Sequence, residues 1–222
     1  IIITTATLFL LNPAFVQLSK IAPEGCLSRA SSRWSNFGEL HGSWVDSTPQ
    51  NNYSLFQSAL RQNDPILYLE HKELWNINET VNIRQSIEIG TAHRLHSGSD
   101  LTLVSWSSAI HRCAEACDRV SSQGVEVDLI DLRSLWPWDK EMVFTSAAKT
   151  GKLLVVHDAV QVSGFGSEIA ASAAEATGCH IQRLGAPRIP VGYAPVLEEQ
   201  TRVGVEKIVE TILHVVERAY DT

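Results

Sequence analysis

The sequence predicts an α/β fold, a three-layer α/β/α domain with a mostly parallel five-stranded sheet over residues 99–222. Apolar runs of strand length alternate along this stretch with segments of helical periodicity, and Gly or Ser stands at the junctions. The run KLLVVHDA has a continuous apolar centre, as expected of a strand buried on both faces. A βαβα alternation of this kind indicates a parallel sheet covered by helices.

Four apolar runs predict the central strands of this sheet. They span residues 101–106, 125–132, 152–159 and 180–184.

Four helices follow these runs in order. Ser107 and Ser108 are typical of a helix N-cap, and Gly124 is typical of the residue after the helix end. Asp139 is expected to cap the second helix, which stops at Thr150 and Gly151. The last two helices are expected over residues 166–177 and 203–220.

A second, smaller unit precedes the sheet domain. Residues 51–61 predict a helix and residues 65–70 a strand, whereas residues 76–98 show no sustained periodicity. We interpret residues 76–98 as a linker, with an extended piece over residues 86–92, because compact domains rarely contain loops of this length.

The first 44 residues stay unassigned. Residues 28–35 are rich in Ser and Arg and poor in acids, which is typical of part of a mitochondrial transit peptide, while the apolar start is typical of an ordinary strand. Both interpretations remain open. The chain begins with Ile, as expected of a processed or incomplete product.

Composition excludes two classes of partner. A formal net charge of -7 argues against nucleic-acid binding, which usually requires a basic face. No stretch reaches the roughly 20 uncharged apolar residues of a membrane span, because Asn12, Pro13 and Gln17 interrupt residues 1–19. We expect no nucleic-acid and no membrane partner.

The cysteines and histidines predict no protein-ligated metal. Cys113 and Cys117 share a helix face, but His111 lies well round from that face. Both cysteines are therefore expected to be small buried hydrophobes. His93 and His96, three apart on a strand, would point to opposite faces.

Five segments together resemble one family. They are DPILYLEHKELW at 64–75, DLTLVSWSSAIHRCAEA at 100–116, VEVDLIDLRSLWPWD at 125–139, VVHDAVQVSGFGSEIAA at 155–171 and RLGAPRIPVGYAPVLEE at 183–199. Their order and spacing are similar to the β subunit of the decarboxylase component of pyruvate and branched-chain 2-oxo acid dehydrogenases. The most specific part is IDLRSLWPWD, followed by VVHDA and GFGSE.

The resemblance implies a transketolase C-terminal-like domain over residues 99–222. Residues 45–75 resemble the last helix and strand of the family's pyrimidine-binding domain, so we interpret them as a remnant of that domain. The glutamate and the histidine-bearing loop that serve thiamine diphosphate in the family have no counterpart in the sequence. The magnesium and diphosphate motif belongs to the family's α chain.

The resemblance also implies cofactors, partners and a location. Thiamine diphosphate and magnesium serve the whole family enzyme, and none is expected to bind this chain alone, because protein groups must place such a cofactor. The expected partners are an α subunit and a second β subunit, with the lipoyl acyltransferase core as a further candidate. The expected location is the bacterial cytoplasm or the mitochondrial matrix. The substrate stays open among pyruvate, branched-chain and acetoin types.

Two histidines are candidate subunit-interface residues. His157 ends a buried strand, where open α/β sheets present functional groups, and Asp158 stands where the family has glutamate. The alternative for His157 is a hydrogen bond to a neighbouring loop. His71 follows the strand at 65–70 and matches the family's glutamate–histidine pair, with a purely structural role as its alternative.

The loop with Gly164, Phe165 and Gly166 precedes a predicted helix that has Glu168 in its first turn. Glycines before a helix can bind phosphate, but Glu168 would repel an anion. We therefore favour packing between subunits for these four residues, with Phe165 as the anchor.

Two further features are expected to be structural. Arg133 follows a predicted strand and is expected to pair with a carboxylate or carbonyls at the sheet edge, with substrate binding as the alternative. Pro187, Pro190 and Pro195 surround Tyr193 and predict a rigid surface loop rather than a helix. Such a loop could meet a partner chain.

Two hypotheses follow for function. The chain is the β-subunit portion of an enzyme that decarboxylates a 2-oxo acid and passes the acyl group to lipoyl, contributing subunit association. Alternatively, it is a truncated or degenerate non-catalytic homologue that serves as a structural element of a larger complex.

Overall fold

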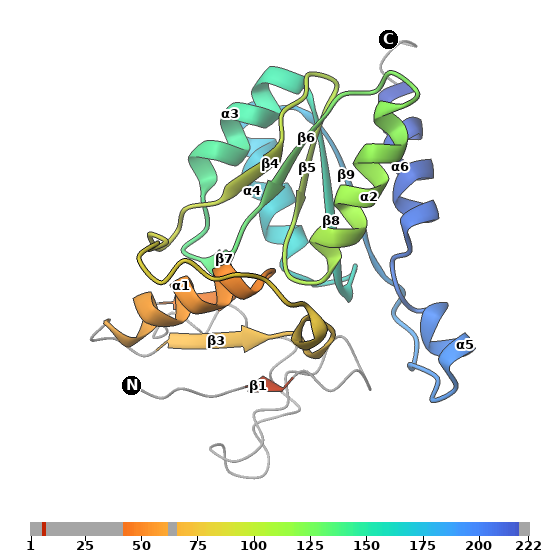
Figure 1. Cartoon of the computed structure of the whole chain (residues 1–222). Coiled ribbons are helices and arrows are strands. Elements are labelled where there is room, and N and C mark those ends of the chain that lie inside the picture. The colour runs from red at the N-terminus through yellow and green to blue at the C-terminus, as the bar shows by residue number, and fades with distance from the viewer. Residues whose placement is uncertain (1–5, 8–41, 62–65, 218–222) are drawn as a thin grey trace.

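The main domain is built on a five-stranded sheet in the order β4-β6-β5-β8-β9, in which only β4 is antiparallel to its neighbour. The computed structural model describes residues 6–7, 42–61 and 66–217 (Figure 1). The strands are β4 (His93–His96), β5 (Leu101–Ser105), β6 (Val127–Asp131), β8 (Lys152–Val160) and β9 (His180–Ala186). The predicted α/β fold with a mostly parallel five-stranded sheet is confirmed.

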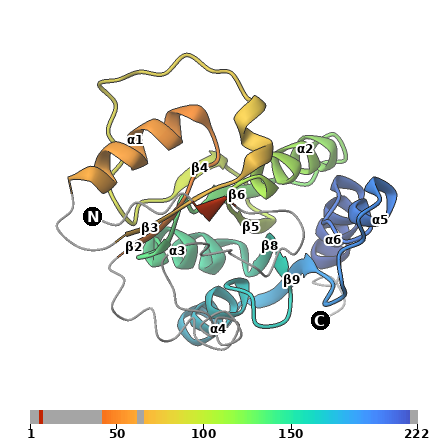
Figure 2. The same cartoon turned by 90° about the horizontal axis from the view of Figure 1, so that it is seen from below.

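Helices cover both faces of this sheet, as Figure 2 shows. One face carries α2 (Ala109–Ser121) and α6 (Val205–Glu217), and the other carries α3 (Lys140–Thr150) and α4 (Gly166–Thr177). Successive strand residues point to opposite faces, so Leu103 packs in the cluster with α2 and α6 while Val104 packs in the cluster with α3 and α4. Both residues are fully buried, which is why apolar residues point to both faces of the central strands.

The predicted helix ends are partly confirmed. Asp139 caps α3 by accepting a hydrogen bond from the Met142 amide at 2.9 Å, and Gly151 ends α3 in the left-handed region with φ of +71°. Ser108 is the N-cap of α2, within the predicted Ser107–Ser108 pair, but its side chain makes no capping hydrogen bond. Its hydroxyl binds Asp158 instead.

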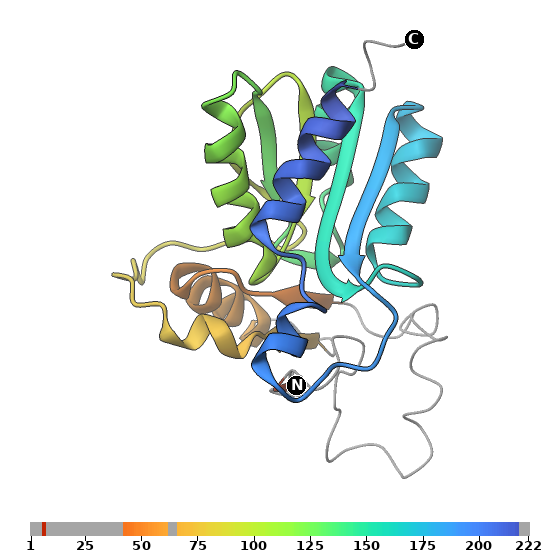
Figure 3. The same ribbon diagram turned by 90° about the vertical axis from the view of Figure 1, so that its right-hand side faces the viewer.

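A smaller sheet lies at the carboxyl edge of the main sheet (Figures 1 and 3). Its order is β1-β3-β2-β7, with β1 (Ala6–Thr7), β2 (Gly42–Val45), β3 (Ile66–Glu70) and β7 (Ser134–Trp136). On one face, α1 (Pro49–Leu60) packs against Trp44 and Tyr68. On the other face, Val45 and Leu69 join the core beneath α3 and α4. The two sheets therefore share a core.

Several elements differ from the sequence prediction. Residues 86–92, where an extended piece was expected, form no strand; β4 follows them at His93–His96, and Ile87 contributes to the core under α1. Sequence reasoning missed β2 and β7, which are only four and three residues long. It also missed α5 (Pro195–Glu199), which begins at the last proline of the loop predicted to be non-helical.

Some predictions fall outside the described residues. They include the transit-peptide interpretation of residues 28–35, Cys26, and the last residues of the predicted helix 203–220, of which Val205–Glu217 is described as α6. Cys113 and Cys117 are buried between α2 and the sheet, as predicted. Among the described helices, none has the length and apolar character needed to cross a bilayer.

Candidate functional site

The strand order identifies one edge of the main sheet as the place to look for a site. From β5 the chain moves to β6 on one side and later to β8 on the other, so the connections diverge between β5 and β8. Ligands of open α/β sheets bind at the carboxyl ends of strands at such a point. Three residues with left-handed backbone follow the strands at this edge, Ser107 after β5, Arg133 after β6 and Ser163 after β8. Strained residues of this kind often cluster at functional sites.

Protein side chains fill the crevice between β5 and β8. The His157 imidazole, in the carboxyl-terminal half of β8, is fully buried and stacks on the Trp106 indole with ring centroids 5.3 Å apart and planes at 17°. The prediction that His157 ends its strand was wrong, because β8 continues to Val160. Phe165 contacts the same indole edge-to-face at 6.1 Å. Aromatic contacts of this geometry add to the free energy gained from burial. An aromatic stack therefore occupies the place where other open α/β sheets bind their ligands.

Three glycines surround the His157 ring. A methyl group in place of hydrogen would lie 2.5 Å from Nε2 at Gly166, 2.8 Å from Cε1 at Gly164 and 2.9 Å from Cε1 at Gly185. Real side-chain carbons do not approach so closely, so glycine is required at these positions for close approach to the ring. The SGFG loop therefore packs against His157 of the same chain. The packing between subunits that we favoured for this loop stays a prediction.

Burial keeps the His157 imidazole neutral. Desolvation lowers its pKa to about 4, and the nearby Ala159 backbone and Asp158 carboxylate oppose this only in part. Neither ring nitrogen has a hydrogen-bond partner among the described residues. The alternative role for His157, a hydrogen bond to a neighbouring loop, stays a prediction.

Asp158 points the other way, toward α2. Its carboxylate pairs with the Arg112 guanidinium and accepts a hydrogen bond from the Ser108 hydroxyl at 2.7 Å. The Arg112 and Asp158 side chains are only about one-fifth exposed, at 21% and 22%, so water screens the pair less than a surface pair. This contact joins the end of β8 to the start of α2.

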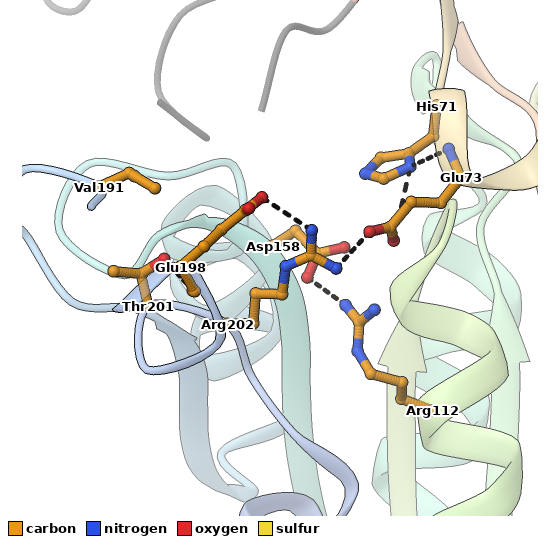
Figure 4. A pocket seen from close by; sticks show the side chains of 8 residues that line it. All are labelled: His71, Glu73, Arg112, Asp158, Val191, Glu198, Thr201 and Arg202. Atoms are coloured by element: carbon orange, nitrogen blue, oxygen red, sulfur yellow. Dashed lines mark hydrogen bonds and ion pairs between the residues drawn. The ribbon is translucent and has the colours of Figure 1, made fainter. Parts of the chain in front are cut away.

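A second group of charges joins the small sheet to the segment before α6, as Figure 4 shows. The Arg202 guanidinium pairs with Glu73, which follows β3, and with Glu198 of α5 at 2.9 Å. His71 precedes Glu73 and accepts a hydrogen bond from the Glu73 amide at Nδ1, at 3.3 Å. Burial lowers the pKa of His71, Arg112 and Arg202 lower it further, and Asp158 and Glu73 oppose the shift.

These residues enclose a small cavity of about 20 Å³. That volume holds about one or two water molecules, whereas pockets for organic ligands are usually some 300–1,000 Å³. We call the surrounding residues the polar junction: His71, Glu73, Arg112, Asp158, Val191, Glu198, Thr201 and Arg202. The cavity is therefore too small for an organic ligand, and the residues of the polar junction contact one another across different segments of the chain.

A further link between the sheets runs through Asp131 at the end of β6. Its carboxylate accepts hydrogen bonds from the Ser47 hydroxyl at 2.5 Å and from the Asn51 amide at 3.5 Å. The His111 ring bonds the Ser47 carbonyl at 2.7 Å. Burial raises the pKa of Asp131 from 3.8 to about 6, although Ser47 and Arg133 oppose that shift.

The predicted interface residues fall into two groups. His71 belongs to the polar junction and is 5% exposed, while His157, Gly164, Phe165 and Gly166 gather around the aromatic stack, with Phe165 half-buried. Glu168 is exposed on α4 and accepts a hydrogen bond from the Ser172 hydroxyl. Their roles between subunits remain predictions. Arg133 donates to the Thr91 and Ala92 carbonyls, as predicted.

Sequence reasoning missed Arg112, Glu73 and Arg202. Arg112 and Asp158 stand 46 residues apart, and Arg202 and Glu73 stand 129 apart, so no local pattern pairs them. Trp106 was included only as the end of a strand. The continuous apolar run before His157 was the signal that could have indicated its full burial.

Comparison with known proteins identifies the fold family. The family model for the transketolase C-terminal domain matches residues 90–208. The chain belongs to this family.

Curated relatives and a solved structure agree with the assignment. The chain is 32% identical over 171 residues to the 2-oxoisovalerate dehydrogenase subunit beta of Bacillus subtilis, covering 74% of this chain and 52% of that protein. It is 29% identical over 175 residues to the pyruvate dehydrogenase E1 component subunit beta of Porphyra purpurea, covering 77% and 53%. The chain thus spans about half the length of these relatives. A split-gene transketolase solved as an inactive beta4 tetramer has the same fold, with a TM-score of 0.71 and 20% identity over 79% of this chain and 58% of that one.

Proposed function

We propose that the chain is the β-subunit portion of a thiamine-diphosphate-dependent 2-oxo acid dehydrogenase, which oxidatively decarboxylates a 2-oxo acid and transfers the acyl group to lipoyl. Its part in that enzyme is subunit association rather than supply of the catalytic groups. The enzyme class in this proposal is supported by the likeness to β subunits of 2-oxo acid dehydrogenases. The observation that carries the association role is the filled crevice: His157 and Trp106 occupy the edge where open α/β sheets bind ligands.

The described residues do not fit thiamine diphosphate and magnesium. The polar junction has three carboxylates against two guanidiniums and a His71 imidazole whose pKa is lowered, so it would repel a diphosphate. Glu168 stands in the first turn of α4, at the end of the helix that would otherwise attract an anion. No group of three or more His, Cys, Asp and Glu side chains suited to a metal occurs in the described ranges. We therefore assign the cofactor to the whole enzyme and derive no step through it.

The proposed partners are an α subunit and a second β subunit, with the lipoyl acyltransferase core as a further candidate. The proposal is supported by the relatives, which are named as β subunits of 2-oxoisovalerate and pyruvate dehydrogenases. Those relatives act on different 2-oxo acids, so the proposal names the class of substrate alone. Bacterial cytoplasm and mitochondrial matrix are the two proposed locations.

A second candidate function, a non-catalytic homologue that serves as a structural element of a larger complex, is favoured by the same filled crevice. The two functions differ in the chain that accompanies this domain. Mass spectrometry of the native protein discriminates between them, because the enzyme portion requires a longer β chain or a separate chain with the catalytic groups.

The surface proposed for association includes the loop after β8. Val162 is 54% exposed and Ile189 is 52% exposed. A hydrogen bond from the Gln161 amide to the Ala186 carbonyl, at 3.0 Å, holds their two loops side by side. Exposed apolar residues on neighbouring loops are candidates for a protein interface.

Phe165→Asp and Val162→Asp are expected to weaken self-association of the chain. We expect the dissociation constant to rise about 30-fold for Phe165→Asp, as for a central interface residue, and about 10-fold for Val162→Asp. Sedimentation velocity over a concentration series measures both. Val162→Asp is needed because Phe165 also contacts Trp106 within the chain.

Ser121→Asp is the matched control, because it adds the same charge at the exposed far end of α2. It should leave the dissociation constant unchanged. If both loop variants sediment as the unaltered chain does, the loop after β8 lies outside the interface.

A further inference from the structure

The segment between β9 and α6 lies apart from the main sheet. We call residues 187–202 the strap. It contains three prolines and α5, in which no residue is buried. Figures 1 and 3 show α5 beyond the carboxyl edge of the main sheet, beside the small-sheet unit. Tyr193 is 92% exposed and Val196 is 73% exposed, so apolar burial contributes little to holding the strap in place.

The strap is well ordered within itself. Gly192 lies so close to Leu197 that an added methyl group would be 2.4 Å from the Leu197 Cβ, so the proline loop packs directly on α5. The Thr201 hydroxyl donates to the Glu198 carbonyl at 2.7 Å. These contacts are all internal, and a segment of this kind can move as one piece.

Charged side chains connect the strap to the 3-10 turn that follows β3 of the small sheet. Arg202 uses one terminal nitrogen for Glu198 of the strap and the other for Glu73 of the 3-10 turn Lys72–Asn76. The Arg202 and Glu73 side chains are 24% and 34% exposed. One guanidinium therefore bridges the strap and the 3-10 turn; within the strap Thr201 is buried, whereas no residue of α5 is.

The strap covers a polar edge of the protein. Val191, Glu198, Thr201 and Arg202 form one side of the cavity in the polar junction, and His71 and Asp158 lie on the other sides (Figure 4). We propose that Arg202 and Glu73 form an electrostatic latch that holds the strap closed over His71 and Asp158. Loss of the latch opens the strap as a unit while both sheets stay folded.

Hydrogen exchange of the full chain tests the latch. Arg202→Gln and Glu73→Gln are each expected to raise the exchange rates of the amides of Leu197, Glu198 and Thr201, which bond within the strap, by about 3- to 10-fold. Peptides from α6 and β8 should exchange at unchanged rates. The double variant should exchange no faster than Arg202→Gln, because Glu73 holds the strap only through Arg202, whereas Arg202 also pairs with Glu198. High salt should open the strap in the unaltered chain and have little effect in the double variant.

Chemical modification gives a second readout. Diethyl pyrocarbonate should modify His71 several-fold faster in the latch variants, because the strap no longer covers it. The fully buried His157 serves as an internal reference and should stay unmodified. Lys207→Gln is the matched control, since it removes an exposed pair with Glu210 within α6.

Three results would overturn the latch. The first is unaltered exchange in the strap and unaltered His71 modification in both single variants. The second is faster exchange throughout β8 and α6, which would make Arg202 a general stabilising residue. The third is an additive effect in the double variant, which would mean that Arg202 and Glu73 act separately.

Discussion

Replacing Gly166 with Ala is expected to lower the free energy of unfolding by about 3 kcal/mol, as overpacking of a tight core does. The new methyl group would lie 2.5 Å from Nε2 and 2.6 Å from Cδ2 of His157. The ring cannot yield, because it is fully buried between Trp106 and the glycines. Urea unfolding with a fitted midpoint and slope measures the loss.

Gly204→Ala is the matched control for this substitution. A methyl group at Gly204 meets nothing within 4 Å, so we expect a change of less than about 1 kcal/mol. The cost of Gly166→Ala should also shrink in a His157→Ala background, where the clashing ring is gone. An equal cost in that background would mean that Gly166 is required for some reason other than His157.

The Asp131 and Asp46 carboxyls are expected to add to the free energy of unfolding on acidification from pH 7.5 to pH 5, whereas the buried His157 imidazole, whose pKa is lowered to about 4, subtracts from it. Burial raises the pKa of Asp131 from 3.8 to about 6, and burial likewise raises the pKa of Asp46 from 3.8 to about 6. Between these pKa values each carboxyl binds more protons in the folded protein than in the unfolded chain, so its contribution to the free energy of unfolding falls as pH rises through the window. At about 1.4 kcal/mol for each pKa unit, acidification to pH 5 gives each carboxyl a contribution of about 1.4 kcal/mol.

The surroundings of each carboxyl explain the sign. Ser47, Arg133 and His111 favour the ionised form of Asp131, but burial outweighs them. Glu70 adds to the effect of burial on Asp46, and hydrogen bonds from Asn52 and the backbone oppose it. Neither carboxyl forms an ion pair within 4.0 Å in the described part of the chain.

Asp131→Asn should make the free energy of unfolding at pH 5, relative to that at pH 7.5, about 1.4 kcal/mol lower than in the unaltered protein, because it removes one carboxyl that takes up a proton in the folded state. Chemical denaturation at half-unit steps of pH provides the comparison. An Asp131→Asn profile that parallels that of the unaltered protein would show that Asp131 does not titrate in this window.

The central strands of the fold could be predicted from the sequence because strands buried on both faces are rich in consecutive apolar residues. Every residue of β5 and β6 is buried, and runs of apolar residues reveal such strands. The edge strand β4 could not be found in this way. Its sequence HRLH is largely exposed and pairs antiparallel with β6, so neither an apolar run nor a clean alternation marks it.

The site was predicted less completely than the fold. The glycine loop indicated close packing, but no pattern in the sequence reveals that its nearest neighbour is His157 of the same chain. The polar junction depends on pairs such as Arg202 with Glu73, which only the folded chain brings together. Sequence patterns give the periodicity of single elements, whereas ion pairs between distant segments depend on how those elements pack.

Titration calorimetry of the full chain with thiamine diphosphate and excess magnesium is the most direct test of an association role. The filled crevice, the carboxylates of the polar junction and Glu168 all oppose a trianionic ligand, and each unfavourable charge contact near the surface costs on the order of 1 kcal/mol. We expect no saturable heat below about 1 mM ligand and no decarboxylase turnover. Saturable binding with a dissociation constant of about 1 μM would contradict the proposal and place a cofactor site on this chain.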